Sequence, residues 1–432
     1  MKTLIFVVLD GGADLPDSRI GNMTAFDVAF KPNIDSLSKN GINGIMKVLP
    51  IPPESDEAVI SILGYDVFKV YTGRGPLEAI GGGLPFKEGD LALRCNFGTL
   101  EEGQIVDVRS GGLTTQESKE LEDAINSFVS LDGAKFSFKA TTAYRGVLVI
   151  RSKERLSPKI SNTHPGYALR YFEPMWTRGA ENIGVPVSEA LASPNMAFKP
   201  AIALDNTKEA KNSAKLVNEF IEKSRAVLYK HPVNMQRIAN GLKPANIILT
   251  RDSGTTAPRL YSFSSVYDTK WLCMADMPVE RGIAIASSMQ VLPMPEPTEN
   301  AEKDMTLRVL ALLKNAHLYD AFYVHLKGPD IYAHKGDIEG KIKSIEDIDR
   351  YFFGPLLANF DMNNSIVVVT CDHTTSSEQR VHTADPVPVT ISGAGITTDG
   401  TTMFSEATCA TGALKQINAL HLMPYLMKLI KS

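Results

Sequence analysis

Several apolar runs that end at acidic or polar residues are the feature of this sequence that most restricts its fold. TLIFVVLD (3–10), AFYVHL (321–326), SIVVVTCD (365–372) and PVPVTIS (386–392) are rich in valine and isoleucine and do not alternate with polar residues. Such runs are typical of parallel-sheet strands that are buried on both faces. We therefore predict a central, mostly parallel sheet that contains these segments.

A helical pattern lies between the second and the third of these strands. In residues 338–360, apolar side chains recur every three or four positions, at Ile338, Ile342, Ile345, Ile348, Phe352 and Leu356. This spacing predicts a helix with one apolar face. Because a strand, a helix and a strand in this order form a βαβ unit, the predicted fold class is α/β, with helices flanking the sheet.

The length of the chain indicates more than one domain. It has 432 residues, and single hydrophobic cores stop growing near ~250–300 residues. The middle of the chain differs in character, with a glycine-rich stretch at 72–83 that we expect to form turns, short strands at 135–151 and a polar helix at 207–228. We predict a second α/β domain at 73–263, inserted into a discontinuous first domain made of 1–72 and 264–432.

Composition excludes some classes of partner. The chain has 45 basic and 49 acidic residues, so it lacks the overall positive charge that attracts nucleic acid. The apolar run at 4–9 is far shorter than the ~20 residues of a membrane span, and no signal-peptide cleavage pattern follows it. The four cysteines form no CxxC pair and are expected to be reduced. We predict a cytoplasmic protein without membrane or nucleic-acid partners.

Acidic and imidazole side chains follow two of the predicted strands. Asp10 comes directly after the first strand, and Asp372 and His373 follow the strand at 365–371. Ligand sites in parallel sheets lie at the carboxyl ends of strands. Taken singly, each residue also fits a turn cap or a satisfied polar residue.

Further residues of the same types lie nearby in the sequence. Asp330 and His334 are four residues apart, a spacing that places both on one face of a helical turn. His382 follows His373 by nine residues and precedes another predicted strand. Carboxylates and imidazoles suit borderline or hard divalent ions. The number of such groups exceeds the needs of one ion with open positions, so we predict two.

Ser55 is a candidate nucleophile. Two prolines precede it and EAVISIL follows, so a helix is expected to begin here with Ser55 or Asp56 as its cap. A helix N-terminus also favours an alkoxide or a bound phosphate. The cap and the nucleophile remain alternative interpretations of the same residue.

Four arginines lie near glycines and could bind phosphate or carboxylate through paired hydrogen bonds: Arg74, Arg94, Arg109 and Arg251. The alternative for each is an ordinary surface ion pair. His325 and Lys327 flank the Asp330 motif, and we expect them to be packing or surface residues without a role in the site.

The motifs together resemble a known family. Asp10, ESDEAVISILGYD, GRGPLEAIGGG, RCNFGTL, GLKPANIILTRDSG, VHLKGPDIYAH, CDHTTSS and HTADPVPV are similar to those of the cofactor-independent phosphoglycerate mutases of the archaeal type, which belong to the alkaline phosphatase superfamily. The resemblance runs from Asp10 to beyond Val389. It implies an alkaline-phosphatase-like α/β fold whose inserted domain binds the substrate and acts as a lid.

The resemblance also implies roles for individual residues. Manganese, zinc or a similar divalent ion such as cobalt or magnesium would occupy two sites, and no 2,3-bisphosphoglycerate would be needed. Ser55 would be phosphorylated transiently during the interconversion of 3-phosphoglycerate and 2-phosphoglycerate, a step of glycolysis and gluconeogenesis. The implied assignments are a first metal on Asp330, His334 and His382, a second on Asp10, Ser55, Asp372 and His373, and substrate binding by Arg251 and Arg94.

The sequence departs from the family pattern at three places. Glu54 replaces the glycine before the nucleophile, VRSGG (108–112) replaces an arginine-rich motif, and SNTHPG (161–166) replaces an acidic stretch. These changes keep two alternatives open: a metal-dependent phosphatase or phosphodiesterase on the same scaffold, and a non-catalytic sensor of phosphorylated metabolites. The oligomeric state stays open as well.

Overall fold

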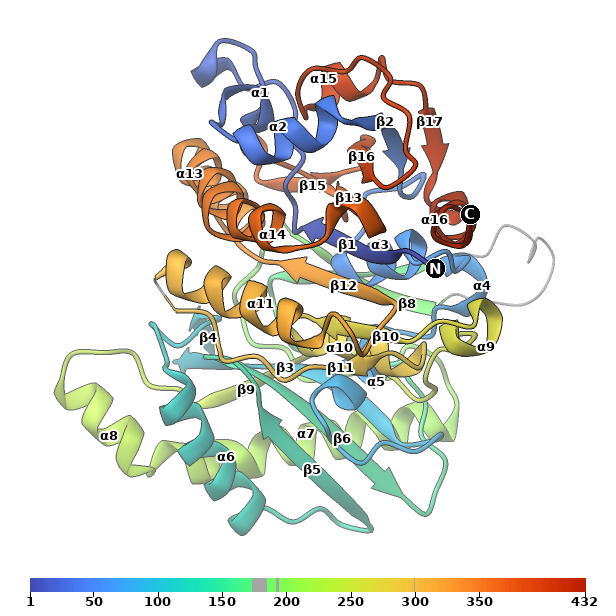
Figure 1. Ribbon diagram of the computed structural model, residues 1–432. Helices are drawn as coiled ribbons and strands as arrows, with labels where there is room; N and C mark the ends of the chain where they lie inside the picture. The colour runs from blue at the N-terminus through green and yellow to red at the C-terminus, as the bar shows by residue number, and fades with distance from the viewer. Residues whose placement is uncertain (173–184, 192–193, 299) are drawn as a thin grey trace. The chain divides into compact units, whose positions relative to one another are not determined.

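A computed structural model describes residues 1–172, 185–191, 194–298 and 300–432, and its chain divides into two compact units (Figure 1). Unit 1 comprises Met1–Val67, Leu260–Asp276 and Ile283–Ser432. Unit 2 comprises Phe68–Arg259 and Met277–Gly282. The sequence prediction had placed the inserted region at 73–263.

Unit 1 is built on an eight-stranded sheet with the order β11-β10-β12-β1-β13-β16-β2-β17. Neighbouring strands are parallel except where β16 pairs with β13 and with β2. The prediction of an α/β fold with a mostly parallel sheet is thus confirmed. The strands are β1 (Thr3–Leu9), β2 (Gly41–Lys47), β10 (Trp271–Met274), β11 (Gln290–Val291), β12 (Ala321–Leu326), β13 (Ser365–Cys371), β16 (Val387–Gly393) and β17 (Lys415–Asn418).

The expectation that the run at 386–392 joins the parallel strands is wrong, because β16 is antiparallel to β13. A parallel pair needs a crossover connection, usually a helix. Between β13 and β16 the chain forms only a short hairpin, made of β14 (Thr374–Ser376) and β15 (Val381–Thr383). The chain therefore returns alongside β13 in the opposite direction.

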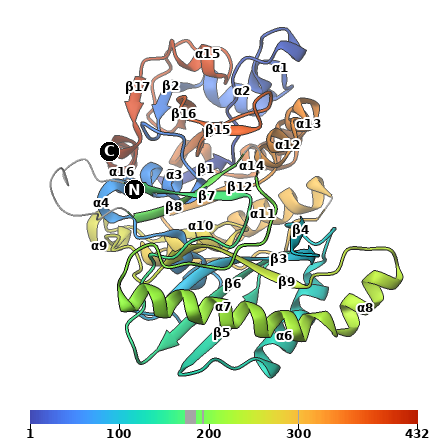
Figure 2. The same cartoon turned by 180° about the vertical axis from the view of Figure 1, so that it is seen from behind.

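Helices cover both faces of the sheet in unit 1, as the complete burial of residues 4–9 in β1 requires (Figures 1 and 2). One layer contains α2, α11, α13 and α14, which contact one another directly or through a π-helical turn, and α3 packs against α16. The helices are α1 (Ala25–Val28), α2 (Pro32–Lys39), α3 (Ser55–Ile62), α9 (Phe263–Tyr267), α11 (Ala301–Asn315), α12 (Pro329–Lys335), α13 (Ile338–Ile348), α14 (Gly354–Asn359), α15 (Glu406–Cys409) and α16 (Ala419–Lys431). Helix α4 (Val67–Val70) begins at the last residue of the first segment of unit 1 and continues in unit 2.

The apolar stripe at 338–360 forms two helices rather than one. A π-helical turn at Asp349–Phe353 separates α13 from α14. Pro355 follows this turn and has no backbone N–H to continue the hydrogen-bond ladder. Ile345, Ile348, Phe352 and Leu356 are nevertheless all buried, so the stripe still faces the core.

Unit 2 contains an antiparallel sheet with the order β4-β3-β6-β5, and β9 pairs with the free edge of β3. Its core includes Leu93, Phe97, Phe138 and Phe220. The strands are β3 (Leu91–Glu101), β4 (Gln104–Asp107), β5 (Ala134–Ala140), β6 (Arg145–Ser152) and β9 (Ile247–Gly254), with a separate pair β7 (Tyr167–Phe172) and β8 (Val185–Ala190). The helices are α5 (Arg74–Gly81), α6 (Thr115–Phe128), α7 (Lys208–Tyr229) and α8 (Pro232–Ala239).

The glycine-rich stretch at 72–83 is largely helical, which corrects the expectation of turns. Its glycines serve close packing of α5 against the start of α10 (Pro278–Ala286). A Cβ on Gly81 would lie 1.7 Å from the carbonyl oxygen of Pro278, and one on Gly282 would lie 2.0 Å from that of Leu77. This contact explains why 277–282 belongs to unit 2, although the sequence assigned it to the first domain.

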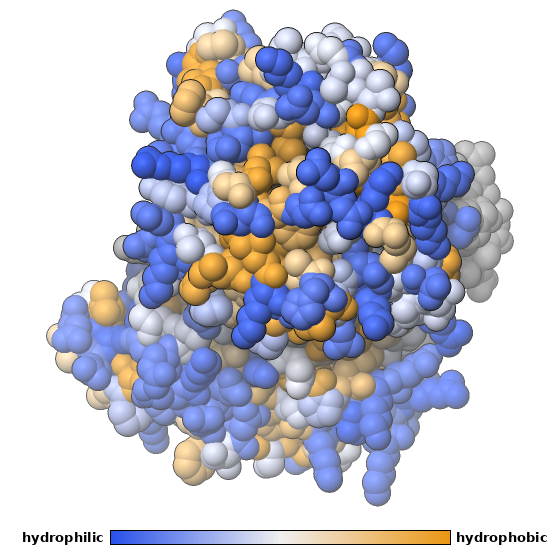
Figure 3. All heavy atoms as spheres, in the orientation of Figure 1, coloured by the Kyte–Doolittle hydropathy of each residue, from blue (hydrophilic) through white to orange (hydrophobic). Residues whose placement is uncertain are grey.

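Hydrophilic side chains cover most of the face in Figure 3, and apolar ones gather over the region of α11. Leu310 on this helix is 57% exposed. Apolar atoms normally make up much of a folded protein's surface. Within the described residues, no helix has both the length and the apolar character to cross a bilayer.

Candidate functional site

The carboxyl ends of three neighbouring strands form the base of the site in unit 1. Leu9 of β1 lies opposite both Leu326 of β12 and Cys371 of β13, so the three strands end in register. Asp10, Lys327 and Asp372 are the residues that follow. Their side chains therefore start from the same edge of the sheet, as the rule for parallel sheets predicts.

Asp10 and Asp372 each have one oxygen held by the protein and the other directed into the site. Asp372 Oδ1 accepts the backbone N–H groups of Gly11 at 2.9 Å and His373 at 3.0 Å. Asp10 Oδ2 lies 2.9 Å from Lys327 Nζ. Within the described residues, Asp10 Oδ1 and Asp372 Oδ2 are buried and make no hydrogen bond of normal geometry.

His325 on β12 belongs to this buried group. Its Nε2 lies 3.5 Å from Asp10 Oδ1 and 3.7 Å from Asp372 Oδ2, and its Nδ1 lies 2.8 Å from the hydroxyl of Tyr323. Asp10, His325 and Asp372 thus offer ligand atoms that converge closely enough to hold one ion. The expectation that His325 and Lys327 only pack or lie at the surface is wrong, since both contact Asp10.

A second group lies beside the first and is more exposed. Asp330 and His334 project from one side of α12, and His382 comes from β15. His334 Nε2 lies 3.0 Å from His382 Nε2, and both nitrogens lie 3.4 Å from Asp330 Oδ1. These three ligand atoms converge on one point.

Backbone carbonyls fix the orientation of both imidazoles in this group. His382 Nδ1 donates to the carbonyl of Pro53 at 2.7 Å, and His334 Nδ1 donates to that of Arg380 at 3.1 Å. Each ring therefore presents its Nε2 to the other ring. A histidine held in this way by a carbonyl is the usual arrangement around a bound metal.

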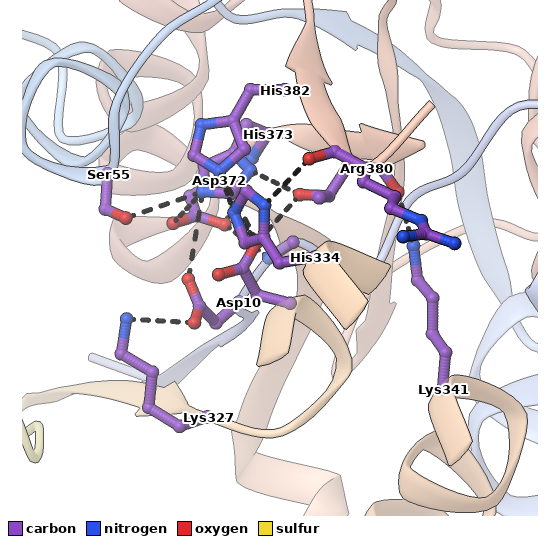
Figure 4. A network of polar contacts seen from close by, with 12 residues as sticks. Asp10, Ser55, Lys327, His334, Lys341, Asp372, His373, Arg380 and His382 are labelled. Atoms are coloured by element: carbon purple, nitrogen blue, oxygen red, sulfur yellow. Dashed lines mark hydrogen bonds and ion pairs between the residues drawn. The ribbon is translucent and has the colours of Figure 1, made fainter. Parts of the chain in front are cut away.

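The β14–β15 hairpin brings His373 and His382 together. Thr375 pairs with His382 across it, and the rings of His373 and His382 stack at 3.8 Å. His373 Nε2 lies 3.3 Å from Asp372 Oδ2 and 3.8 Å from Asp10 Oδ1, so this ring reaches the buried group. The two groups are thus adjacent (Figure 4).

Ser55 is the first residue of α3, and its side chain points toward His373 (Figure 4). Ser55 Oγ lies 3.5 Å from His373 Nε2. The N-cap is Glu54, whose N–H donates to the Glu57 carboxylate at 3.2 Å. The expectation that Ser55 or Asp56 caps the helix is therefore wrong, and the Ser55 hydroxyl is not committed to capping.

The charges in this cluster perturb several pKa values. Burial and then the charge of Asp10 raise the pKa of Asp372 to about 7. Burial disfavours the charged form of Asp10, but Lys327 and His325 outweigh it and hold the pKa of Asp10 well below its ordinary value. Burial alone would lower the pKa of His382. The hydrogen bond and the charge of Asp330 outweigh burial and raise this pKa to about 10. Both groups therefore favour positive charge between their ligand atoms.

The donor set fits divalent cations. It consists of carboxylate oxygens and imidazole nitrogens, without thiolates, as borderline and hard ions prefer. In the part of the chain that the structure describes, two buried carboxylate oxygens have no hydrogen-bond donor and two imidazole nitrogens face each other. A cation would satisfy these atoms. The structure brings together all seven residues predicted as metal ligands: Asp10, Ser55, Asp330, His334, Asp372, His373 and His382.

Unit 2 contains a buried cluster of arginines. Arg94 on β3 and Arg251 on β9 are direct cross-strand partners, and β9 continues to Gly254, so Arg251 lies within its strand rather than at its end. Arg74 joins them by sharing the Glu78 carboxylate with Arg94, at 2.9 and 3.7 Å. Burial, Arg251 and Arg74 lower the pKa of Arg94 to about 10. Arg109 is exposed and lies against Tyr144 instead.

Asp252, Tyr167 and His164 lie next to these arginines. Arg251 pairs with Asp252 at 2.5 Å, and its guanidinium lies 3.8 Å from the centre of the Tyr167 ring. His164, in the segment that replaces the family's acidic stretch, is buried and contacts Asn96 at 3.2 Å. Burial, together with Arg251 and Arg94, lowers the pKa of His164 to about 3. The positive charge of the cluster thus acts on both His164 and Arg94.

Comparisons with known proteins identify the family of this chain. The family model for 2,3-bisphosphoglycerate-independent phosphoglycerate mutase matches residues 38–234. A mutase of that name from Methanocaldococcus jannaschii is 36% identical over 99% of this chain and 97% of its own, and one from Aeropyrum pernix is 36% identical over 96% of each.

Solved structures show the same relationship. A protein from Pyrococcus horikoshii has a TM-score of 0.76 and 27% identity, over 100% of this chain and 97% of its own. The cofactor-independent phosphoglycerate mutase from Thermoplasma acidophilum has a TM-score of 0.61 and 30% identity over 100% of both chains. The full-length identity to several mutases is decisive: the chain belongs to the 2,3-bisphosphoglycerate-independent phosphoglycerate mutase family.

Proposed function

We propose that this chain interconverts 3-phosphoglycerate and 2-phosphoglycerate through a phosphoserine on Ser55, without 2,3-bisphosphoglycerate. The observation that carries the proposal is the position of the Ser55 hydroxyl, 3.5 Å from His373 Nε2 and beside two converging groups of metal-binding atoms. Membership of the mutase family supports the same reaction.

Two divalent ions, manganese or zinc for example, would be held at this site. Asp330, His334 and His382 would hold one. Asp10, Ser55, Asp372 and His373 would hold the other, with the imidazole of His325 directed at the same point. When bound, the ions would lower the pKa of the serine hydroxyl and neutralise charge on the phosphoryl group.

Ser55 would act as the nucleophile in both directions. Its Oγ forms a bond to phosphorus while the bond between phosphorus and the 3-oxygen of the substrate breaks, and the serine proton ends on the released 3-hydroxyl. The 2-hydroxyl of the retained glycerate then takes the phosphoryl group, and its proton returns to Ser55. The N–H groups at the start of α3 favour the anionic phosphoryl group through the helix dipole.

Arg94 and Arg251 would bind the substrate. Arg94 and Arg251 lie opposite each other on neighbouring strands, and Arg74 shares the Glu78 carboxylate with Arg94. A planar guanidinium binds a carboxylate or a phosphate through two parallel hydrogen bonds. We propose that these arginines of unit 2 bind the glycerate part of the substrate.

The test is conversion of 3-phosphoglycerate by full-length protein that has been stripped with a chelator and reconstituted with Mn²⁺, in the absence of bisphosphoglycerate. Enolase would report the 2-phosphoglycerate formed. We expect activity in the reconstituted wild type, none in Ser55→Ala, and near-normal activity in Ser61→Ala. Ser61 lies on the same helix, but its hydroxyl is bonded to the carbonyl of Val48.

The same assay separates the alternatives. If more inorganic phosphate is released than 2-phosphoglycerate is formed, the chain acts as a phosphatase or phosphodiesterase and not as a mutase. Binding of 3-phosphoglycerate without any turnover would indicate a sensor. A covalent phosphoryl group on wild-type protein but not on Ser55→Ala, detected by mass spectrometry, would support the serine intermediate independently of the overall rate.

A further inference from the structure

The hydroxyl of Thr375 lies between the two groups of metal-binding atoms. Thr375 Oγ1 donates to Asp330 Oδ1 at 2.9 Å and lies 3.0 Å from His373 Nδ1. Asp330 belongs to the more exposed group, whereas His373 reaches the buried one. Thr375 itself is completely buried.

The direction of these hydrogen bonds determines the tautomer of His373. A threonine hydroxyl has a single hydrogen, and here Thr375 donates it to the Asp330 carboxylate. It can therefore only accept from His373, whose proton must be on Nδ1. The lone pair of His373 is then on Nε2, the atom that lies 3.3 Å from Asp372 Oδ2 and 3.5 Å from Ser55 Oγ.

We propose that Thr375 is a positioning residue that sets His373 in its metal-binding tautomer and couples the two metal sites through one hydrogen-bonded chain. The inference rests on the proposed two-metal site. Hydrogen bonds of this kind orient first-shell ligands and raise their basicity. A shift of Asp330 as it binds one ion is transmitted through the hydroxyl to the imidazole that binds the other.

The surroundings of Thr375 keep its hydroxyl in this position. Its N–H donates to the carbonyl of Ala13 at 3.0 Å, and its own carbonyl accepts from Lys341 Nζ at 2.9 Å. Gly11 leaves space on the remaining side, because a Cβ there would lie 2.6 Å from both Thr375 Oγ1 and Asp330 Oδ1. The left-handed φ of +55° also favours glycine at this position.

Three variants of the full-length protein test the inference. Thr375→Val keeps the shape and removes the hydroxyl, and Thr375→Ser keeps the hydroxyl. Thr370→Val is the matched control, because Thr370 is equally buried on β13 but its hydroxyl donates to the backbone carbonyl of Pro388 at 2.9 Å. Calorimetric titration of chelator-treated protein with Mn²⁺ measures the affinity of both sites, and the absorption spectrum of the Co²⁺ form reports their ligand geometry.

We expect Thr375→Val to bind Mn²⁺ about 10- to 100-fold more weakly at both sites, with an altered Co²⁺ spectrum, whereas Thr375→Ser and Thr370→Val resemble the wild type. Wild-type affinity in Thr375→Val, weakening at only one site, failure of Thr375→Ser to rescue, or equal weakening in Thr370→Val would each overturn the inference. If the wild type itself binds no metal, the proposed function fails instead, so the two failures are distinguishable.

Discussion

Replacement of Lys341 by methionine should destabilise unit 1 strongly, because Lys341 is a fully buried cation. From α13, its Nζ donates at 2.9 Å to the carbonyl of Ala13, to Asp14 Oδ2 and to the carbonyl of Thr375. It therefore joins the loop after β1, which carries Asp10, to strand β14, which follows His373 directly. Methionine fills a similar volume but offers no donor.

The size of the effect follows from what the substitution leaves behind. The carboxylate of Asp14 would stay buried, with hydrogen bonds from neutral groups such as the N–H and hydroxyl of Ser377 at 3.1 and 2.6 Å. Breaking one partner of a buried ion pair costs about 3–5 kcal/mol. Asp14→Asn in the Lys341→Met background removes the stranded charge, so we expect a favourable coupling of about 2–3 kcal/mol between the two changes.

Urea unfolding followed by circular dichroism would measure the free energy of unfolding of both single variants and the double variant. Lys343→Met is the matched control, since Lys343 lies two residues from Lys341 on α13, is 65% exposed and pairs with Asp347. An exposed pair of this type contributes at most about 0.5 kcal/mol. A loss in Lys341→Met no larger than in Lys343→Met, or strictly additive effects in the cycle, would refute the reasoning.

Three further predictions concern pH, substrate binding and metal. The pKa of His164 is lowered to about 3, whereas an unfolded histidine has a pKa near ~6.5, so the unfolded chain binds more protons than the folded one as the pH falls below that value. The free energy of unfolding of the wild type should therefore fall with decreasing pH, and that of His164→Gln should fall by about 2 kcal/mol less between neutral pH and pH ~5 in urea unfolding. Equal losses in the two proteins would refute this assignment. Arg251→Lys should raise the KM for 3-phosphoglycerate about tenfold with a smaller change in kcat, because lysine cannot form the planar paired contact; an unchanged KM would exclude Arg251 from substrate binding. Removal of metal with a chelator should abolish activity and lower the urea midpoint, and Mn²⁺ should restore both; a midpoint that does not respond to Mn²⁺ would argue against a metal bound to the folded state.

The sheet and its edge could be predicted from the sequence because their signals are local. The valine- and isoleucine-rich runs predict buried strands, and Asp10 and Asp372 follow two of them directly. The spacing of Asp330 and His334 likewise predicts one helical face, which α12 provides. Such predictions need only the periodicity of the chain and the rule that sites lie at the carboxyl ends of parallel strands.

Other features depend on contacts between distant segments and could not be predicted in this way. The direction of β16 depends on the absence of a crossover helix between β13 and β16. The helical state of 74–81 depends on α10, which packs so closely against α5 that glycine is needed at Gly81 and Gly282. His325 had one usable signal, an imidazole in an apolar strand one residue before its end. Thr375 and Lys341 had none, since a threonine in a polar run and a lysine in an amphipathic helix are ordinary residues until the fold buries them.

The register that brings the ligands together also creates an electrostatic cost. Strands β1 and β13 end in register, so the carboxylates of Asp10 and Asp372 are buried side by side. Like charges in a medium of low polarity repel each other strongly. The fold offsets part of this repulsion with Lys327 on the outer oxygen of Asp10 and with two backbone N–H groups on Asp372. Each of these contacts engages only one oxygen of its carboxylate. The inner oxygens face His325 and His373, where a divalent cation would relieve the remaining repulsion, so the same geometry that destabilises the metal-free site favours metal binding.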